Sequence, residues 1–330
     1  MKLLYIYTQP EFCVHEHIVN FLKEKGVEIT FEPVNIVNSW GTDLTKFSKP
    51  EFIEKYKEIN YDFILSAVHS TFPQIVQFQK EIKPKIGFID IEHDLFANDM
   101  PEYSLSYNKS LLITFNKRHY ATANRLLKND RKIVRCRWIK LDANYPKVDF
   151  DSVDMWTDAI LIGTGMWEGQ DFSNIPYFKE FRKVWYKKYE DCWEISGVNI
   201  LPKQFVGPLG SKYCADACKF FITQASSCYQ DALLFGSIPL LLPSNIIKAK
   251  QEDDILSTVE MKVWMPPGIS PFKAIVVDKN IGEKLHKLRN SISLFNEVKE
   301  TLFLEWFAED HYSLPSAHEI IYNFMSENYI

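Results

Sequence analysis

The stretch from Phe220 to Asn245, FFITQASSCYQDALLFGSIPLLLPSN, constrains the fold of this chain more than any other. Phe220 to Thr223 is a short apolar run typical of a buried strand, and Ser227 opens a sequence that matches a helix capping box. Gly236 stands where helices favour a C-terminal glycine, and a second apolar strand begins at Pro239. The stretch therefore predicts a strand, a turn, a short helix and a second strand in direct succession.

The turn and helix are suited to a nucleoside diphosphate. Ser226 and Ser227 supply small hydroxyls and free backbone N–H groups at the positive end of the helix dipole. Asp231, one turn into the helix, is placed to accept hydrogen bonds from ribose hydroxyls. The same residues also suit ordinary helix capping, in which each contributes about 0.3–1 kcal/mol. The residues by themselves leave both interpretations open.

This stretch resembles the carboxyl-terminal half of GT-B-fold glycosyltransferases and of related UDP-sugar epimerases. The resemblance implies an α/β fold with two Rossmann-like domains that face a cleft, and C-terminal helices that pack across both. It also implies a nucleotide-diphosphate sugar, most simply a UDP-sugar, as co-substrate, with no metal or other cofactor required. Retaining members of the family carry a Glu where Thr223 stands, so we expect an inverting transfer. The residues that carry the resemblance are Ser226, Ser227, Asp231, Ala232, Gly236 and Pro239.

Length and composition agree with two domains. A chain of 330 residues exceeds a comfortable single core, and the polar stretch between Leu141 and Asp158 is typical of a linker. We therefore expect an N-terminal acceptor-side domain over residues 1–147 and a C-terminal nucleotide-sugar domain with terminal helices over residues 148–330. No stretch approaches the roughly 18 apolar residues that a membrane span needs, and the first residues resemble a strand more than a signal peptide. We expect a cytoplasmic protein.

Apolar runs alternate with helical periodicity along the chain, which is typical of parallel α/β sheets. In the second half, a strand from Ala159 to Gly163 leads into Thr164 and Gly165, and we expect these residues to line the donor site with Ser226 and Ser227. A helix is expected from Pro176 to Glu190. In the first half, the expected strands are Leu3–Tyr7, Val27–Pro33, Phe63–Ala67, Ile86–Ile91, Leu111–Phe115 and Ile133–Ile139.

Asp90 is the first candidate for the catalytic base, since an inverting transfer needs a group that takes the acceptor proton. It lies at the end of an expected strand, in the segment KIGFIDIEHD. That segment is similar to one in the phage DNA β-glucosyltransferases, where the aligned Asp is catalytic. His15 is the rival base, because it lies where the first strand passes into the first helix, and this position resembles the one at which many inverting plant-type GT-B enzymes place a histidine. Cys13, His15 and His17 do not form a metal site on a helix, since residues two apart diverge by about 200°.

A basic tract between Lys117 and Lys140 points to an anionic partner, although the net charge of the chain is −5. On a helix, Lys117, Arg118, Arg125 and Lys128 fall within about a 100° sector, opposite Tyr120, Ala123, Leu126 and Leu127. Arg135 and Arg137 share one face of the next strand. A solvated face balanced by acidic loops is the alternative explanation. The tract comprises Lys117, Arg118, Arg125, Lys128, Arg131, Lys132, Arg135, Arg137 and Lys140.

These observations together predict a glycosyltransferase that moves a sugar from a nucleotide-diphosphate donor to a hydroxyl acceptor. Hydroxylated double-stranded DNA, as in phage DNA glucosylation, is the preferred acceptor, and a polysaccharide or lipid-linked glycan is the competitor. A hydrolysing or epimerising enzyme would use the same nucleotide site. A catalytically inactive GT-B-like module that binds nucleotide or nucleic acid is a further alternative. The oligomeric state is left open.

Overall fold

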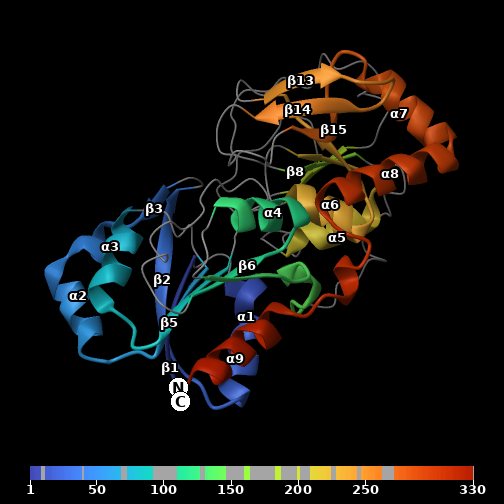
Figure 1. The fold of residues 1–330 in the computed structure, drawn as a ribbon. Helices are drawn as coiled ribbons and strands as arrows, with labels where there is room; N and C mark the ends of the chain where they lie inside the picture. Colours follow the sequence, from blue (N-terminus) through green and yellow to red (C-terminus); the bar gives the residue numbers. More distant parts are fainter. Residues whose placement is uncertain are drawn as a thin grey trace. The chain divides into compact units, whose positions relative to one another are not determined.

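The computed structural model describes residues 1–8, 12–38, 41–67, 73–91, 110–126, 131–145, 160–163, 183–186, 199–200, 209–223, 228–243, 247–261 and 271–329. The chain forms two compact units (Figure 1). Unit 1 gathers Met1–His93, Ala97–Asn144 and Ala308–Ile330, and unit 2 is built mainly from Tyr145–Phe307. Among the described residues, no helix combines the length and the apolar character that crossing a bilayer demands.

Unit 1 contains a sheet of seven described strands in the order β3-β2-β1-β4-β5-β6-β7. All neighbouring pairs are parallel except β2 with β3. The chain builds outward from β1 to β2, then returns to place β4 on the other side of β1, so the direction of winding reverses between β1 and β4. The strands are β1 (Lys2–Thr8), β2 (Glu28–Asn38), β3 (Gly41–Asp43), β4 (Phe63–Ala67), β5 (Gly87–Ile91), β6 (Ser110–Thr114) and β7 (Arg131–Arg135).

Helices cover both faces of this sheet. Helices α2 and α3 pack together on one face, and α1 and α9 pack together on the other (Figure 1). The core under α2 and α3 includes Phe47, Tyr56, Phe78 and Phe88, all nearly inaccessible. The helical elements of unit 1 are α1 (Phe12–Glu24), η2 (Thr45–Ser48), α2 (Pro50–Lys57), α3 (Pro73–Ile82), α4 (Lys117–Leu126), η4 (Ile139–Leu141), η9 (His311–Ser313) and α9 (Ala317–Asn328).

Unit 2 contains eight described strands in the order β10-β9-β8-β11-β12-β15-β14-β13. The first six are parallel, and β14 and β13 add an antiparallel extension. The direction of winding reverses between β8 and β11, which is the same plan as in unit 1. The strands are β8 (Ile160–Gly163), β9 (Lys183–Tyr186), β10 (Asn199–Ile200), β11 (Phe220–Thr223), β12 (Ile238–Leu241), β13 (Ile247–Gln251), β14 (Ser257–Met261) and β15 (Phe272–Val276).

The segment that most constrained the fold has the predicted succession of elements. Strand β11 is followed by α6 (Cys228–Phe235), and Gly236 then adopts a φ of 109°, a conformation that favours glycine after a helix. Strand β12 follows and pairs in parallel with β11. The other helices of unit 2 are α5 (Gly210–Ala217), α7 (Ile281–Asn290) and α8 (Ile292–Trp306).

The carboxyl-terminal segment divides between the two units. Helices α7 and α8 belong to unit 2, whereas the residues from Ala308 onward belong to unit 1, where α9 packs on α1. The sequence assigned all of 148–330 to the second domain, and the structure differs from that assignment in these last residues. The predicted helix from Pro176 to Glu190 is wrong at Lys183–Tyr186, which form β9. The sequence there is KVWY, and its Val, Trp and Tyr favour strands.

Candidate functional site

The predicted donor residues follow the two strands between which the winding of unit 2 reverses. Gly163 ends β8 and Thr223 ends β11, and the strands pair in parallel through Ile160 with Phe220 and Ile162 with Ile222. In open α/β sheets, ligands bind beyond the carboxyl ends of strands at such a reversal point. Thr164, Gly165, Ser226 and Ser227 lie outside the described residues.

Asp231 lies in the first turn of α6 and is fully buried. Its Oδ2 accepts a hydrogen bond of 2.5 Å from the hydroxyl of Ser211, which lies in the first turn of α5. Ser211 is also fully buried. The hydrogen bond therefore joins the amino-terminal turns of two neighbouring helices, and it orients the carboxylate that the sequence assigned to ribose.

Asp90 lies in β5, one residue before the strand ends. It is 2% exposed and stands in register with Ser66 of β4 on one side and Leu112 of β6 on the other. Side chains in register on neighbouring parallel strands project from the same face of a sheet. Asp90 thus lies near the carboxyl end of its strand, beside Ser66 of the neighbouring strand.

His15 is buried in α1, and its Nδ1 lies 2.7 Å from the hydroxyl of Tyr5 in β1. Its ring also stacks against that of Tyr5, with the centroids 6.2 Å apart. The structure therefore connects His15 to β1 of unit 1.

The basic tract divides into two structural parts. The first part is α4, which buries His119, Thr122 and Ala123 and leaves Arg125 exposed. Tyr120 is 37% exposed, so its predicted position on the packed face is wrong. It lies at the margin of the buried face, about 100° from His119 around the helix axis. Lys128 lies outside the described residues.

The second part begins at β7, and its Lys132, Arg135 and Arg137 form ion pairs within unit 1. Arg135 pairs with Asp310 at 3.1 Å, and Arg137 binds both carboxylate oxygens of Asp142. Lys132 pairs with Glu327 at 3.1 Å. Strand β7 forms an edge of the sheet, which explains why a strand can carry so many cations. Arg137 lies beyond the end of β7, so the predicted common strand face with Arg135 is wrong.

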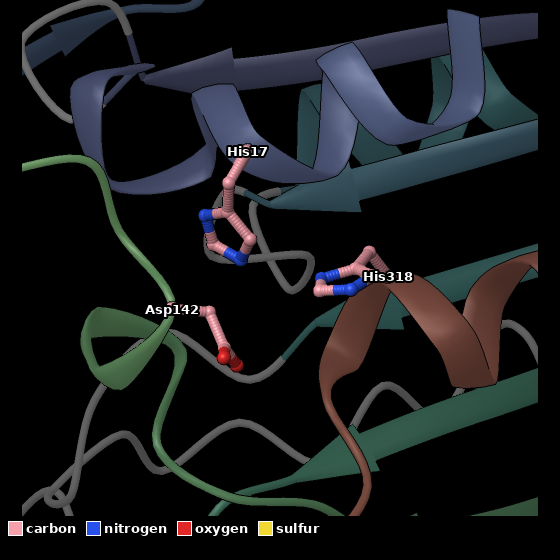
Figure 2. A group of neighbouring side chains, drawn as sticks. All are labelled: His17, Asp142 and His318. Atoms are coloured by element: carbon pink, nitrogen blue, oxygen red, sulfur yellow. The ribbon is translucent and has the colours of Figure 1, made fainter. Parts of the chain in front are cut away.

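A cluster of metal-ligand side chains lies elsewhere in unit 1. His17 of α1, Asp142 after η4 and His318 of α9 project into the same space (Figure 2). Their potential ligand atoms all lie within 4.8 Å of one another. Burial lowers the pKa of His17 to about 4 and also lowers the pKa of His318. Two neutral imidazoles therefore face one carboxylate at neutral pH.

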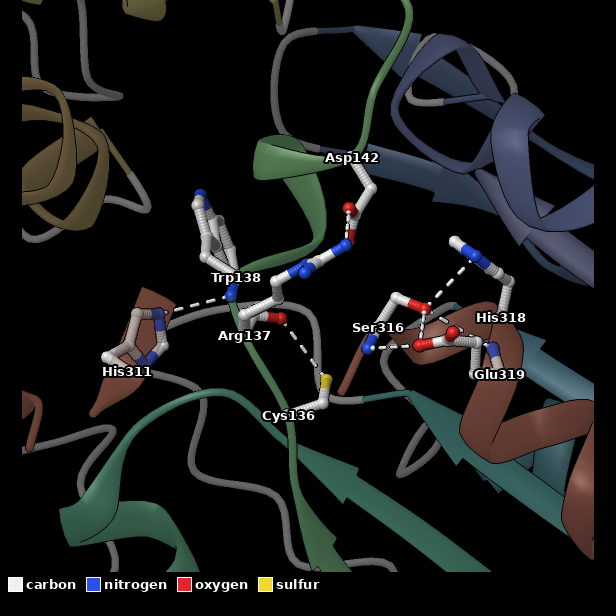
Figure 3. A network of polar contacts seen from close by, with 8 residues as sticks. All are labelled: Cys136, Arg137, Trp138, Asp142, His311, Ser316, His318 and Glu319. Atoms are coloured by element: carbon white, nitrogen blue, oxygen red, sulfur yellow. Dashed lines mark hydrogen bonds and ion pairs between the residues drawn. The ribbon is translucent and has the colours of Figure 1, made fainter. Parts of the chain in front are cut away.

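Polar contacts fix the surroundings of this cluster (Figure 3). The hydroxyl of Ser316 donates to Glu319 at 2.7 Å and lies 3.0 Å from Nε2 of His318. The backbone N–H of Trp138 donates to Nε2 of His311 at 3.1 Å. This bond and the one from the backbone N–H of Arg137 to the carbonyl of Pro315, at 3.2 Å, hold the segment after β7 against the carboxyl-terminal segment.

Sequence reasoning missed Ser211, Asp142 and His318. Ser211 lies twenty residues before Asp231, in a segment for which the sequence predicted neither a helix nor a functional motif. Asp142 and His318 become neighbours of His17 only because α9 returns to α1, and no local pattern reports that return. The capping box at Ser316 marks the start of α9 in the sequence, but not what α9 contacts.

No protein-family model matches the chain, and no curated protein matches it. Solved structures do share its fold. S. aureus MnaA, solved with UDP, matches with a TM-score of 0.60 and 14% identity over 98% of this chain and 96% of that one. The UDP-GlcNAc 2-epimerase of Methanocaldococcus jannaschii matches with a TM-score of 0.57 and 13% identity over 99% of this chain and 100% of that one.

The glycosyltransferase SnogD from Streptomyces nogalater matches with a TM-score of 0.56 and 11% identity, over 99% of this chain and 100% of that one. These similarities span essentially the whole chain and confirm the predicted two-domain GT-B fold. At such low identity they establish the fold alone. The similarity of the Asp90 segment to phage DNA β-glucosyltransferases stays a prediction.

Proposed function

We propose that this protein is a glycosyltransferase that uses a nucleotide-diphosphate sugar. The observation that carries the proposal lies in unit 2. Both predicted halves of the donor site follow strands β8 and β11, between which the winding reverses, and the helix after β11 carries Asp231 in its first turn. Because solved structures with this fold include one bound to UDP, a uridine diphosphate sugar is the donor we favour.

In this proposal the diphosphate binds the backbone N–H groups and hydroxyls at Ser226 and Ser227, with Gly163, Thr164 and Gly165 beside it. Asp231 accepts hydrogen bonds from the ribose hydroxyls. Since its carboxylate is fully buried and holds Ser211, nucleotide binding must make one carboxylate oxygen accessible. Ser211 then keeps the other oxygen in place.

Asp90 is the proposed base. Its carboxylate takes the proton of the acceptor hydroxyl while the acceptor oxygen bonds to the anomeric carbon of the sugar. The bond from that carbon to the diphosphate oxygen breaks, and the nucleoside diphosphate leaves with its electron pair, stabilised by the N–H groups of unit 2. His15 is the alternative base, and its hydrogen bond to Tyr5 would orient its ring.

For the acceptor, the basic face of α4 favours an anionic substrate, and hydroxylated double-stranded DNA is our first choice. The residues proposed to contact it are Lys117, Arg118, Arg125, Lys128, Arg135 and Arg137. The ion pairs of Arg135 and Arg137 with Asp310 and Asp142 reduce the charge that these two offer. A phosphorylated or lipid-linked glycan is the alternative acceptor.

A nucleotide-sugar epimerase is the second candidate, because an epimerase matches the chain as well as a glycosyltransferase does, with TM-scores of 0.57 and 0.56. An epimerase would convert the nucleotide sugar without any acceptor. A binding module without turnover is the third candidate. It would bind the nucleotide but catalyse no reaction.

Incubation with radiolabelled UDP-glucose and UDP-GlcNAc separates these candidates. We expect release of UDP that depends on an added hydroxyl acceptor, with the label recovered in hydroxymethylated DNA. Recovery of the label in a glycan would show that the acceptor is a glycan and not DNA. Conversion of the sugar without acceptor would establish the epimerase, and the absence of any turnover in a protein that binds UDP would contradict the glycosyltransferase. An Asp90→Asn preparation is the control for contaminating activity.

A further inference from the structure

We propose that His17, Asp142 and His318 form a binding site for a divalent transition-metal ion, for which Zn²⁺ is the best match. The cluster lies wholly in unit 1 and joins three segments that are far apart in the chain: helix α1, the turn after η4, and helix α9 (Figure 2). Two imidazoles and one carboxylate are ligands that Zn²⁺ favours, and three protein ligands leave a fourth position for water.

The geometry requires little adjustment. Tetrahedral bonds of about 2.1 Å separate neighbouring ligand atoms by about 3.4 Å. The ligand atoms here lie within 4.8 Å of one another, so a closure of at most about 1.4 Å brings them into range. Changes of side-chain torsion angles are sufficient for a movement of that size.

The contacts of His318 leave its Nδ1 atom available to bind a metal ion. The hydroxyl of Ser316 donates its proton to Oε2 of Glu319 at 2.7 Å. The Ser316 oxygen then accepts from Nε2 of His318, which must carry the ring proton. Nδ1 therefore keeps its lone pair, and it is buried without a hydrogen bond to any described residue. A carboxylate that orients a ligand histidine through its other nitrogen is typical of metal sites.

His17 is equally suited. Its side chain is 8% exposed, and neither ring nitrogen makes a hydrogen bond of ordinary geometry within the described part of the chain. The backbone of Val14 lies close enough to favour the protonated ring slightly, which engages one nitrogen at most. The other is available to a metal.

Asp142 can bind a metal while it holds Arg137. Arg137 donates one hydrogen bond to each carboxylate oxygen, whereas the two oxygens together offer about four acceptor positions. Arg137 then orients the carboxylate as an outer partner. Among the charged groups that act on His318, Asp142 and Glu319 are negative and Arg137 is positive.

Metal-free protein titrated with ZnCl₂ at pH 7.5 in a calorimeter tests the site. We expect one saturable site, and at least about 100-fold weaker affinity in His17→Gln and in His318→Gln. His286→Gln, at an exposed position of α7, is the matched control and should bind as the wild type does. The wild type and this control should also unfold at a higher temperature with Zn²⁺, and the two cluster variants should not.

Co²⁺ provides a measurement that needs no variant. In the unaltered protein we expect the visible spectrum of a tetrahedral nitrogen and oxygen site, displaced by Zn²⁺. A thiolate charge-transfer band would place the ion at cysteines and overturn the proposal. Failure of the wild type to bind Zn²⁺ at one equivalent, or wild-type affinity in both cluster variants, would overturn it as well. The histidines would then only pack α9 onto α1.

Discussion

Ser211 donates a hydrogen bond of 2.5 Å to Oδ2 of Asp231, and both side chains are fully buried. This contact fixes the carboxylate that we assign to ribose, and it joins α5 to α6 at their amino-terminal turns. Ser211→Ala removes a donor to a buried carboxylate, so the free energy of unfolding should fall by about 1–3 kcal/mol. Urea denaturation measures the change. Asp216→Asn, on an exposed side chain of the same helix, should change it by no more than about 0.5 kcal/mol.

Asp90→Asn preserves the shape of the side chain but removes its capacity to accept a proton. Turnover of the nucleotide sugar should fall by about 10²–10⁴-fold, while UDP affinity stays unchanged. Single-turnover kinetics with calorimetry on the same preparations checks both quantities. His15→Gln retains a partner for Tyr5 and should turn over at a rate close to that of the wild type. If His15→Gln loses turnover and Asp90→Asn retains it, the two roles are reversed.

The basic face of α4 should govern affinity for a polyanion. Reversal of Arg118, Arg125 and Lys128 to Glu should weaken DNA binding for all sequences and leave UDP affinity intact, because phosphate contacts are largely independent of sequence. Each lost contact should reduce the slope of log affinity against log salt by about 0.9. Reversal of Lys248, Lys250 and Lys273 in unit 2 makes the same charge change and is the control. Equal losses of DNA affinity in both triple variants would exclude this surface as the DNA-binding site. The absence of DNA binding by the wild type at about 50 mM salt would exclude it as well.

His311 should make the stability of unit 1 depend on pH. Burial and the neighbouring Arg135 lower its pKa to about 4, and its Nε2 accepts from the backbone of Trp138 only when that nitrogen is unprotonated. The unfolded chain has the ordinary pKa of about 6.5 and binds the proton first, so stability falls as the pH drops from about 6.5 to about 4. The slope is about 1.4 kcal/mol per pH unit in that window, and zero above it.

His311→Gln retains an acceptor for Trp138 and does not titrate. The urea midpoint of this variant should therefore fall less steeply than that of the wild type between pH 6.5 and pH 4.5. His17 and His318 are present in both proteins, so their contributions cancel in the comparison. Parallel pH profiles for the two proteins would show that His311 does not cause the dependence.

The sequence predicted those parts of the fold that local patterns encode. The apolar runs at Leu3–Tyr7 and Phe63–Ala67 became β1 and β4, because buried parallel strands need continuous apolar residues. It did not predict the antiparallel pair β13 and β14. Strand β13 has no run of buried residues, and Lys248 and Lys250 within it are exposed.

The candidate sites also divide into residues that local sequence patterns indicate and residues that only tertiary packing brings together. Asp90 and Asp231 could be proposed from the sequence because a recognisable strand contains Asp90 and another precedes the helix that carries Asp231. The pairing of His17 with His318 depends on a chain that leaves unit 2 and returns to unit 1 after Phe307, and packing over that distance has no local signature in the sequence. Ser211 was missed for the same reason, since only the packing of α5 on α6 brings it to Asp231.

Calorimetric titration of UDP tests the donor site most directly. We expect the wild type to bind UDP, and Asp231→Asn to bind it about 10- to 100-fold more weakly, because a lost hydrogen bond to a charged group costs about 1–3 kcal/mol. Asp216→Asn should bind as the wild type does. The wild type should bind 2′,3′-dideoxyuridine diphosphate more weakly than UDP, whereas Asp231→Asn should bind the two ligands almost equally. The hydroxyls missing from the ligand and the carboxylate missing from the variant belong to the same contact, so their losses should not add. Equal UDP affinity in the wild type and a folded Asp231→Asn protein would contradict the account.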